Sequence, residues 1–122
     1  MAHTDHASCI AACNDCADAC DHCAAACLQE DDVKIMARCI ALDMDCAQIS
    51  RLAASYMARG SEMARSLCTV CAEICEACAN ECARHAHMEH CQRCAAACRR
   101  CAEECRAMVG HAHTSSREAM PA

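Results

Sequence analysis

Cysteine is the residue type whose number and spacing dominate the chemistry of this sequence. The chain has 122 residues, and 18 of them are cysteine, several times the usage of an ordinary protein. Thiolate sulfur is a soft ligand that selects Cu(I), Zn or iron–sulfur clusters, so we predict that all 18 are metal ligands. They are Cys9, Cys13, Cys16, Cys20, Cys23, Cys27, Cys39, Cys46, Cys68, Cys71, Cys75, Cys78, Cys82, Cys91, Cys94, Cys98, Cys101 and Cys105.

The spacing of these cysteines is helical. Three dense groups, at 9–27, 68–82 and 91–105, repeat in alternating steps of three and four residues. Such steps match the period of an α-helix, and at about 100° per residue they place each group in one stripe. Thiols one turn apart can bind an ion between them without any change in the backbone. Disulfides within a stripe are disfavoured, because the Cβ atoms lie about 5–6 Å apart and a disulfide needs roughly 3.5–4.5 Å. Bridges between helices are still open.

Four helices are needed to position these stripes, at about residues 5–28, 33–58, 61–85 and 88–109. Alanine, the best helix former, is abundant in all four. Asp31 or Asp32 can cap the second helix, Gly60 suits the position after its end, and Ser61 can cap the third. Gly110 is expected to end the fourth helix, and the tail at 110–122 is expected to be flexible.

The fold class that follows is all-α. Short connections make neighbouring helices antiparallel, which gives an up-down-up-down four-helix bundle. The chain has no Phe, no Trp and one Tyr, so a usual aromatic and aliphatic core cannot fill the interior. We therefore predict a single domain over residues 1–122, with the cysteine stripes turned inward as a cysteine-lined core.

Charge and hydropathy exclude several classes of partner. The net charge of −6 and the lack of a basic stripe argue against nucleic acid. No apolar run approaches the length of a membrane span. The N-terminus has neither a basic nor an apolar region typical of a secretory signal, so we expect a cytoplasmic protein. In a reducing cytosol, many cysteines indicate metal rather than disulfides.

The charge of the filled core distinguishes among the soft metals. If all the thiols ionise, zinc bound by four sulfurs per ion leaves about nine negative charges in a partly dry interior, which is very costly. One Cu(I) per thiolate replaces one proton by one cation and keeps the core near neutral. The cysteine–proline run of bacterial iron–sulfur proteins is missing. We therefore predict multiple Cu(I) ions per chain, on the order of the cysteine count.

The cysteine rows resemble those of the bacterial copper storage proteins, a family of four-helix bundles that bind copper. The resemblance covers residues 9 to 105. The rows that carry it include Cys9-Ile10-Ala11-Ala12-Cys13, Cys23-Ala24-Ala25-Ala26-Cys27, Cys71-Ala72-Glu73-Ile74-Cys75 and Cys94-Ala95-Ala96-Ala97-Cys98. It implies the cytosolic branch, Cu(I) held largely by Cys-x3-Cys pairs, a storage role and a homotetramer. The second helix departs from this pattern, since neither Cys39 nor Cys46 belongs to a Cys-x3-Cys pair.

The two ends of the predicted bundle differ in their residues. One end gathers Met36, His85, His87 and His90, whose thioether and imidazole groups are candidate Cu(I) ligands where metal enters. The alternative is that these histidines are merely solvated helix ends. The other end is expected to form a hydrophobic plug. The plug residues are Ile49, Leu52, Tyr56, Met57, Met63 and Leu67.

One carboxylate, Asp43, lies between Cys39 and Cys46 on the second helix. We expect it to reach solvent at the rim of the stripe. If it is buried instead, it is a candidate acceptor for protons released as thiols bind copper.

The function predicted from these residues is cytosolic storage and sequestration of Cu(I), and not enzyme catalysis. No nucleophile has a base and an orienting group beside it. A copper chaperone, or a zinc or mixed soft-metal buffer, is the alternative. A chaperone needs only one or two exposed thiols, whereas this chain carries rows of them. The sequence does not specify a protein that donates or accepts the copper.

Overall fold

The computed structural model describes the backbone of residues 6–119 and the side chains of residues 6–110. The helices are α2 (Ala7–Cys27), α3 (Ala37–Ala58), α4 (Ala64–Ala83) and α5 (Glu89–Ala119), and the short 3-10 helix η1 (Val33–Met36) leads into α3. Residues 6–119 contain no β-strand. The all-α prediction is therefore confirmed.

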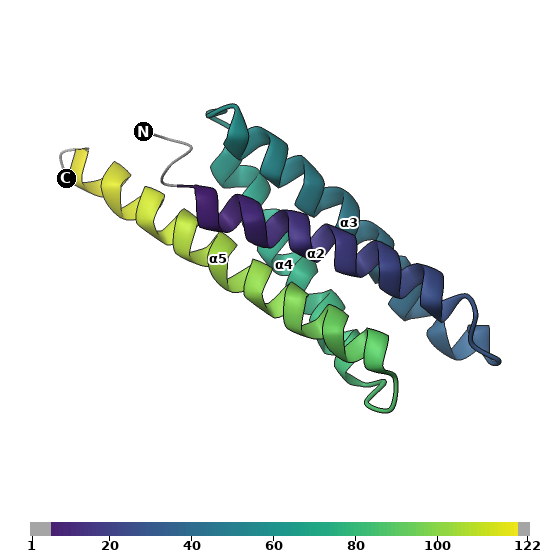
Figure 1. Cartoon of the computed structure of the whole chain (residues 1–122). Helices are drawn as coiled ribbons and strands as arrows, with labels where there is room; N and C mark the ends of the chain where they lie inside the picture. Colours follow the sequence, from purple (N-terminus) through teal and green to yellow (C-terminus); the bar gives the residue numbers. More distant parts are fainter. Residues whose placement is uncertain (1–5, 120–122) are drawn as a thin grey trace.

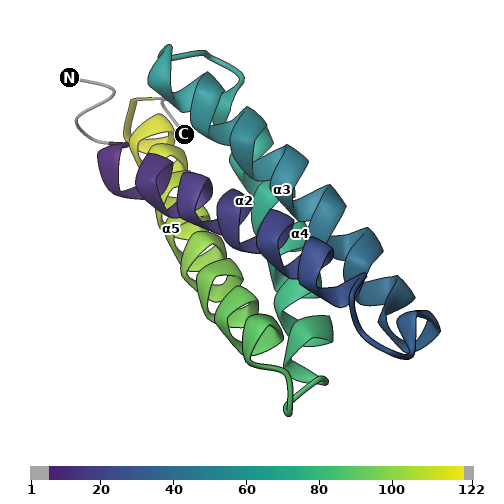
Figure 2. The ribbon, with the colours of Figure 1, turned by 45° about the vertical axis from the view of Figure 1, so that its right-hand side comes forward.

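The four long helices form an antiparallel bundle (Figure 1). Each packs against two neighbours: α2 against α3 and α5, and α4 against α3 and α5. The turns from α2 to α3 and from α4 to α5 lie at one end, as both views show (Figures 1 and 2). We call this the histidine end (residues 27–39 and 82–91), and we call the end near the turn from α3 to α4 the Tyr56 end.

In the turn from α3 to α4, Gly60 ends the helix as the sequence predicts. Gly60 adopts a positive φ of 66°, which glycine accommodates without a steric cost. The amide of Gly60 donates to the carbonyl of Met57, and the amide of Ser61 donates to the carbonyl of Tyr56, both at 3.0 Å. This pair of hydrogen bonds is a Schellman motif. The Ser61 hydroxyl accepts a hydrogen bond from the amide of Met63 at 3.1 Å, within the turn. Ser61 does not cap α4 as predicted, because α4 begins at Ala64 with Met63 as its N-cap residue and no side-chain capping hydrogen bond.

Two further predictions about helix ends are wrong. Asp32 directly precedes η1, but its side chain makes no capping hydrogen bond. The last helix does not end at Gly110, because α5 continues to Ala119. A lone glycine costs a helix only about 1 kcal/mol relative to alanine, and the next proline is Pro121. The helix α5 therefore includes residues 110–119, while 120–122 lie outside the described residues.

The interior is lined mainly by cysteine and alanine, and most charged side chains lie outside, with Asp43 and Glu81 as buried exceptions. Ion pairs on the outer face join neighbouring helices, such as Arg100 with Asp15 at 3.0 Å and Arg106 with Glu76 at 2.8 Å. The cysteine stripes of all four helices consequently meet along one axis.

The hydrophobic plug at the Tyr56 end is smaller than predicted. Met57 is fully buried, and Ile49, Tyr56 and Leu67 pack partly buried against the core. Leu52 and Met63 are instead 45% and 49% exposed. Leu52 lies about 140° around the helix from Met57, at about 100° per residue, and Met63 lies in the turn before α4.

Candidate metal centre

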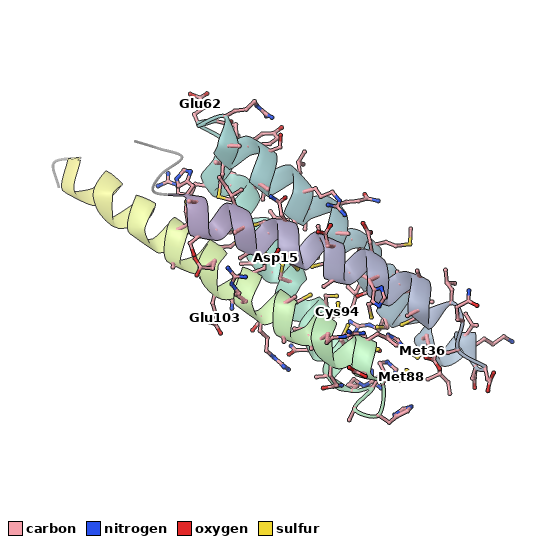
Figure 3. All side chains as sticks on the ribbon, viewed as in Figure 1. Asp15, Met36, Glu62, Met88, Cys94 and Glu103 are labelled. Atoms are coloured by element: carbon pink, nitrogen blue, oxygen red, sulfur yellow. The ribbon has the colours of Figure 1, made fainter. Side chains whose placement is uncertain are left out.

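All 18 cysteines are free thiols with buried side chains. Neighbouring sulfur atoms lie 3.5 to 4.0 Å apart, well beyond the roughly 2.05 Å of a disulfide bond. The bridges between helices that the sequence left open are therefore not formed. Sulfur atoms run along the inside of the bundle instead (Figure 3), and we call them the sulfur array.

The middle of the sulfur array contains one cysteine from each helix. Cys46 Sγ of α3 lies 3.5 Å from both Cys16 Sγ of α2 and Cys75 Sγ of α4. Cys98 Sγ of α5 completes the layer, 3.6 Å from Cys16 and 3.8 Å from Cys46. Cys46 has no cysteine one turn away on its own helix, so its sulfur neighbours come from the other three helices.

Further groups continue the array toward the Tyr56 end. Cys13, Cys71, Cys101 and Cys105 place their four sulfur atoms within 4.8 Å of one another. Cys9 Sγ extends this group, 3.7 Å from Cys105 Sγ. Because neighbouring groups are in contact, metal ions bound along the axis can share bridging sulfurs.

Ser50 is a member of this interior that the sequence analysis missed. Its side chain is fully buried, and its Oγ lies 3.6 Å from Cys71 Sγ and 3.8 Å from Cys75 Sγ. The spacing could have predicted this position, because Ser50 follows Cys46 by four residues and so lies on the same face of the helix. A hydroxyl thus occupies a position in α3 where the pattern of the other helices has a thiol.

Asp43 is fully buried, so the expectation that it reaches solvent is wrong. Cys78 and Cys94 donate to its Oδ1 at 3.1 and 3.3 Å. Burial, reinforced by the sulfur groups of Cys94 and Cys78, raises the pKa of Asp43 to about 10. Without metal, the carboxyl group is therefore neutral at pH 7, which removes the cost of an isolated buried charge.

At the histidine end, one of the predicted histidines meets the sulfur array. His90 Nδ1 lies 3.6 Å from Cys23 Sγ and from Cys91 Sγ, and 3.9 Å from Cys27 Sγ. On its other side, His90 Nε2 lies 3.0 Å from Glu30 Oε2. Glu30 was also missed from the sequence, where it is one of several acidic residues in the turn.

The other candidates at this end have different surroundings. His85 Nε2 pairs with Glu81 Oε2 at 3.0 Å, while His87 is exposed. Arg38 of α3 also binds Glu81, at 3.0 Å. Burial opposes ionisation of Glu81, but the contacts with His85 and Arg38 outweigh it and lower the pKa of this carboxyl. Met36 is fully buried and lies at the same end as Met88 (Figure 3).

A sequence profile of the copper storage proteins matches residues 2–110 of this chain. This chain belongs to the copper storage protein family. A curated relative, the uncharacterized cysteine-rich protein YhjQ of Bacillus subtilis, is 48% identical over 85 residues, which are 70% of this chain and 78% of the relative.

Solved structures of the family share the fold. The Cu(I)-bound copper storage protein BsCsp3 is 46% identical, with a TM-score of 0.82, over 86% of this chain and 98% of its own. A cytosolic copper storage protein from Streptomyces lividans, described with five coppers, is 42% identical, with a TM-score of 0.85, over 88% of this chain and 94% of its own.

Two thiols at the histidine end retain their protons without metal. Burial raises the pKa of Cys91 to about 12 and that of Cys27 above its usual range. Because thiolate is the form that binds metal, each binding event must release a proton.

Proposed function

We propose that this chain stores and sequesters many Cu(I) ions in its sulfur array. The observation that carries the proposal is the approach of buried thiols from all four helices to 3.5–4.0 Å. The relatives support it: BsCsp3 is described as Cu(I)-bound, and the Streptomyces lividans protein as loaded with 10 copper equivalents.

The charge of the buried interior favours Cu(I) over zinc as the stored ion. Each protonated thiol is neutral, and a thiolate with its own Cu(I) is neutral as well. Filling the array with zinc would leave excess negative charge among fully buried sulfurs, at a high desolvation cost. Asp43 does not change this balance, because its carboxyl already carries a proton at neutral pH, which also argues against a role as proton acceptor.

Titration of the reduced apo-protein with Cu(I), against a competing chelator, tests the storage proposal. We expect saturation at a number of ions on the order of the 18 cysteines. Saturation at one or two ions would reject storage and favour a copper chaperone. Metal analysis after expression in copper-fed and zinc-fed cells separates Cu(I) storage from a zinc or mixed soft-metal buffer, for which the zinc content would match the copper content.

Copper, in our proposal, enters through the histidine end, with His85, His87, His90 and Met36 as candidate ligands on the way in. His90 supports this, because its side chain is 13% exposed while its Nδ1 faces three sulfurs. Stopped-flow mixing with a Cu(I) donor should show slower uptake by His85→Ala/His87→Ala and by His90→Ala variants. His22→Ala, on the outer face of α2, is the matched control. Uptake as fast as in wild type would reject the proposal that copper enters past these histidines.

A cytoplasmic location and a homotetramer complete the proposal. The described relative from Streptomyces lividans is cytosolic, and within residues 6–119 no helix has the length and hydropathy to span a bilayer. Met44, Leu52 and Val70 leave 44–52% of their surface exposed on α3 and α4, which is apolar area available to other subunits. Sedimentation equilibrium should give the mass of four chains, and the mass of one chain would reject the tetramer.

A further inference from the structure

Four side chains at the histidine end differ in chemistry from the groups deeper in the sulfur array. Cys23 and Cys27 come from α2, and His90 and Cys91 come from α5. Their ligand atoms all lie within 4.8 Å of one another. Three thiols and one imidazole form the Cys3His set found in structural zinc sites.

The distances among these four atoms agree with a tetrahedral zinc ion. The sulfur atoms lie 3.8 Å (Cys23 to Cys27), 3.9 Å (Cys23 to Cys91) and 4.0 Å (Cys27 to Cys91) apart. His90 Nδ1 lies 3.6 to 3.9 Å from them. With Zn–S near 2.3 Å and Zn–N near 2.0–2.1 Å, a tetrahedron separates two sulfurs by about 3.8 Å and a sulfur from the nitrogen by about 3.6 Å. The set thus needs adjustments of only a few tenths of an ångström.

Glu30 supplies the outer contact that such a site requires. Its Oε2 lies 3.0 Å from His90 Nε2, on the side of the ring away from the sulfurs. This arrangement directs the lone pair of Nδ1 toward the three thiols. A carboxylate on the second nitrogen of a metal-binding histidine fixes its tautomer and orientation, and raises its basicity.

The charge balance also favours placing a divalent ion at this site rather than in the deeper groups of cysteines. Zinc with three thiolates and a neutral histidine leaves one negative charge, whereas four thiolates leave two. Cys13, Cys71, Cys101 and Cys105 would have to hold those two charges while fully buried. At the histidine end, His90 and Glu30 are 13% and 34% exposed, so solvent reaches the site and the desolvation cost is lower.

We propose that Cys23, Cys27, His90 and Cys91 form a zinc site that joins α2 to α5 in the copper-free protein. The ion binds the last turn of α2 to the first turn of α5, and Glu30 connects the turn from α2 to α3 to the same site. Three thiol protons are released on binding. One zinc ion per chain thereby holds the histidine end together while the deeper sulfurs await copper.

Zinc binding to the reduced, copper-free full chain tests this proposal. Zn²⁺ alone is added in competition with a chromophoric chelator, and we expect one tight ion per chain. His90→Ala should weaken this binding by at least tenfold, while His22→Ala, an exposed histidine on the outer face of α2, should bind as wild type does. Co²⁺ used as a spectroscopic probe should give the intense visible bands of a tetrahedral thiolate site, and His90→Ala should shift them.

A second variant keeps the test independent of any folding defect. Glu30→Gln changes only the outer contact and should weaken zinc binding about tenfold, the lower end of the usual range for such partners, with Asp31→Asn as the control. Wild-type affinity in both His90→Ala and Glu30→Gln, several equivalent zinc ions per chain, or no binding at micromolar Zn²⁺ would each overturn the site. Cu(I) capacity measured on the same wild-type protein reports separately on storage, so the two proposals fail independently.

Discussion

The buried carboxyl group of Asp43 makes the stability of the apo-protein depend on pH. Its pKa of about 10 lies above the ordinary aspartate value of 3.8, so the folded state binds one more proton than the unfolded state between these values. This contribution to stability is complete below about pH 4 and is lost as the pH rises toward 10. Between pH 5 and 7, the free energy of unfolding should therefore fall by about 1.4 kcal/mol for each unit that the pH rises.

Replacing Asp43 by Asn should remove this slope. Urea unfolding of reduced apo-protein at pH 5, 6 and 7 measures it, in a range where the thiols of the unfolded chain keep their protons. Asp45→Asn changes an exposed carboxylate on the same helix and should retain the wild-type slope. Equal slopes in wild type and Asp43→Asn would show that the buried carboxyl is not held neutral.

Ser50 allows the link between thiol number and copper capacity to be tested at one position. Its Oγ lies within 4.0 Å of four cysteine sulfurs, those of Cys46, Cys71, Cys75 and Cys101. A Ser50→Cys variant should therefore saturate at about one more Cu(I) than wild type, since one thiolate balances one monovalent cation. Ser55→Cys adds the same thiol at an exposed position of α3 and should add no ion that resists the competing chelator. An unchanged endpoint for Ser50→Cys, with 19 thiols confirmed by assay, would contradict the one-to-one ratio.

At the scale of the elements, the two glycines respond in opposite ways to the same substitution. Gly60 has a φ of 66°, so Gly60→Ala should lower the free energy of unfolding by about 1 kcal/mol. Gly110 lies within α5, and a Cβ added there would meet nothing within 4 Å. Gly110→Ala should therefore raise the free energy of unfolding by about 0.5–1 kcal/mol. Urea unfolding of the reduced apo-variants measures both, and a loss of stability in Gly110→Ala would argue against a helix that continues to Ala119.

The helices and their inward stripes could be predicted because spacing in steps of three and four is a property of each helix alone. Gly60 and Ser61 gave the turn between α3 and α4 for a similar reason, since their backbone preferences are local. The end of α5 could not be predicted from Gly110, because one glycine weakens a helix without stopping it.

The site depends on how the helices are shifted along one another, which the sequence does not specify. Cys46 contacts Cys16 and Cys75 because of the way the helices are shifted along one another. Which sulfurs form a group could therefore be read only from the structure. Asp43 was expected at the surface because carboxylates are seldom fully buried. Its protonated state follows from burial, so it could be inferred only after the structure showed its neighbours. Ser50 could be found from the spacing, because it follows Cys46 by four residues, although a serine is not itself typical of a soft-metal site.

Across the whole molecule, the sulfur array connects all four helices, so copper should stabilise the bundle without changing its helical content. The thiol contacts already close the core in the structure, so we expect the helices to form without metal. An ion held at a free concentration 100 times its Kd adds about 2.7 kcal/mol to the folded state. In a domain of this size, 1 kcal/mol shifts Tm by about 4 °C.

Partial loading should consequently raise Tm by more than about 10 °C, which is the effect of a single such ion. Circular dichroism of reduced protein at increasing Cu(I) ratios measures both Tm and helical content. Excess chelator should return Tm to that of the apo-protein, which controls for irreversible change. A helical signal that appears only with copper would mean that the apo-chain is unfolded, while an unchanged Tm would place the copper outside the array. The expected result, constant helix with rising Tm, distinguishes a preformed store from a chain that folds around its metal.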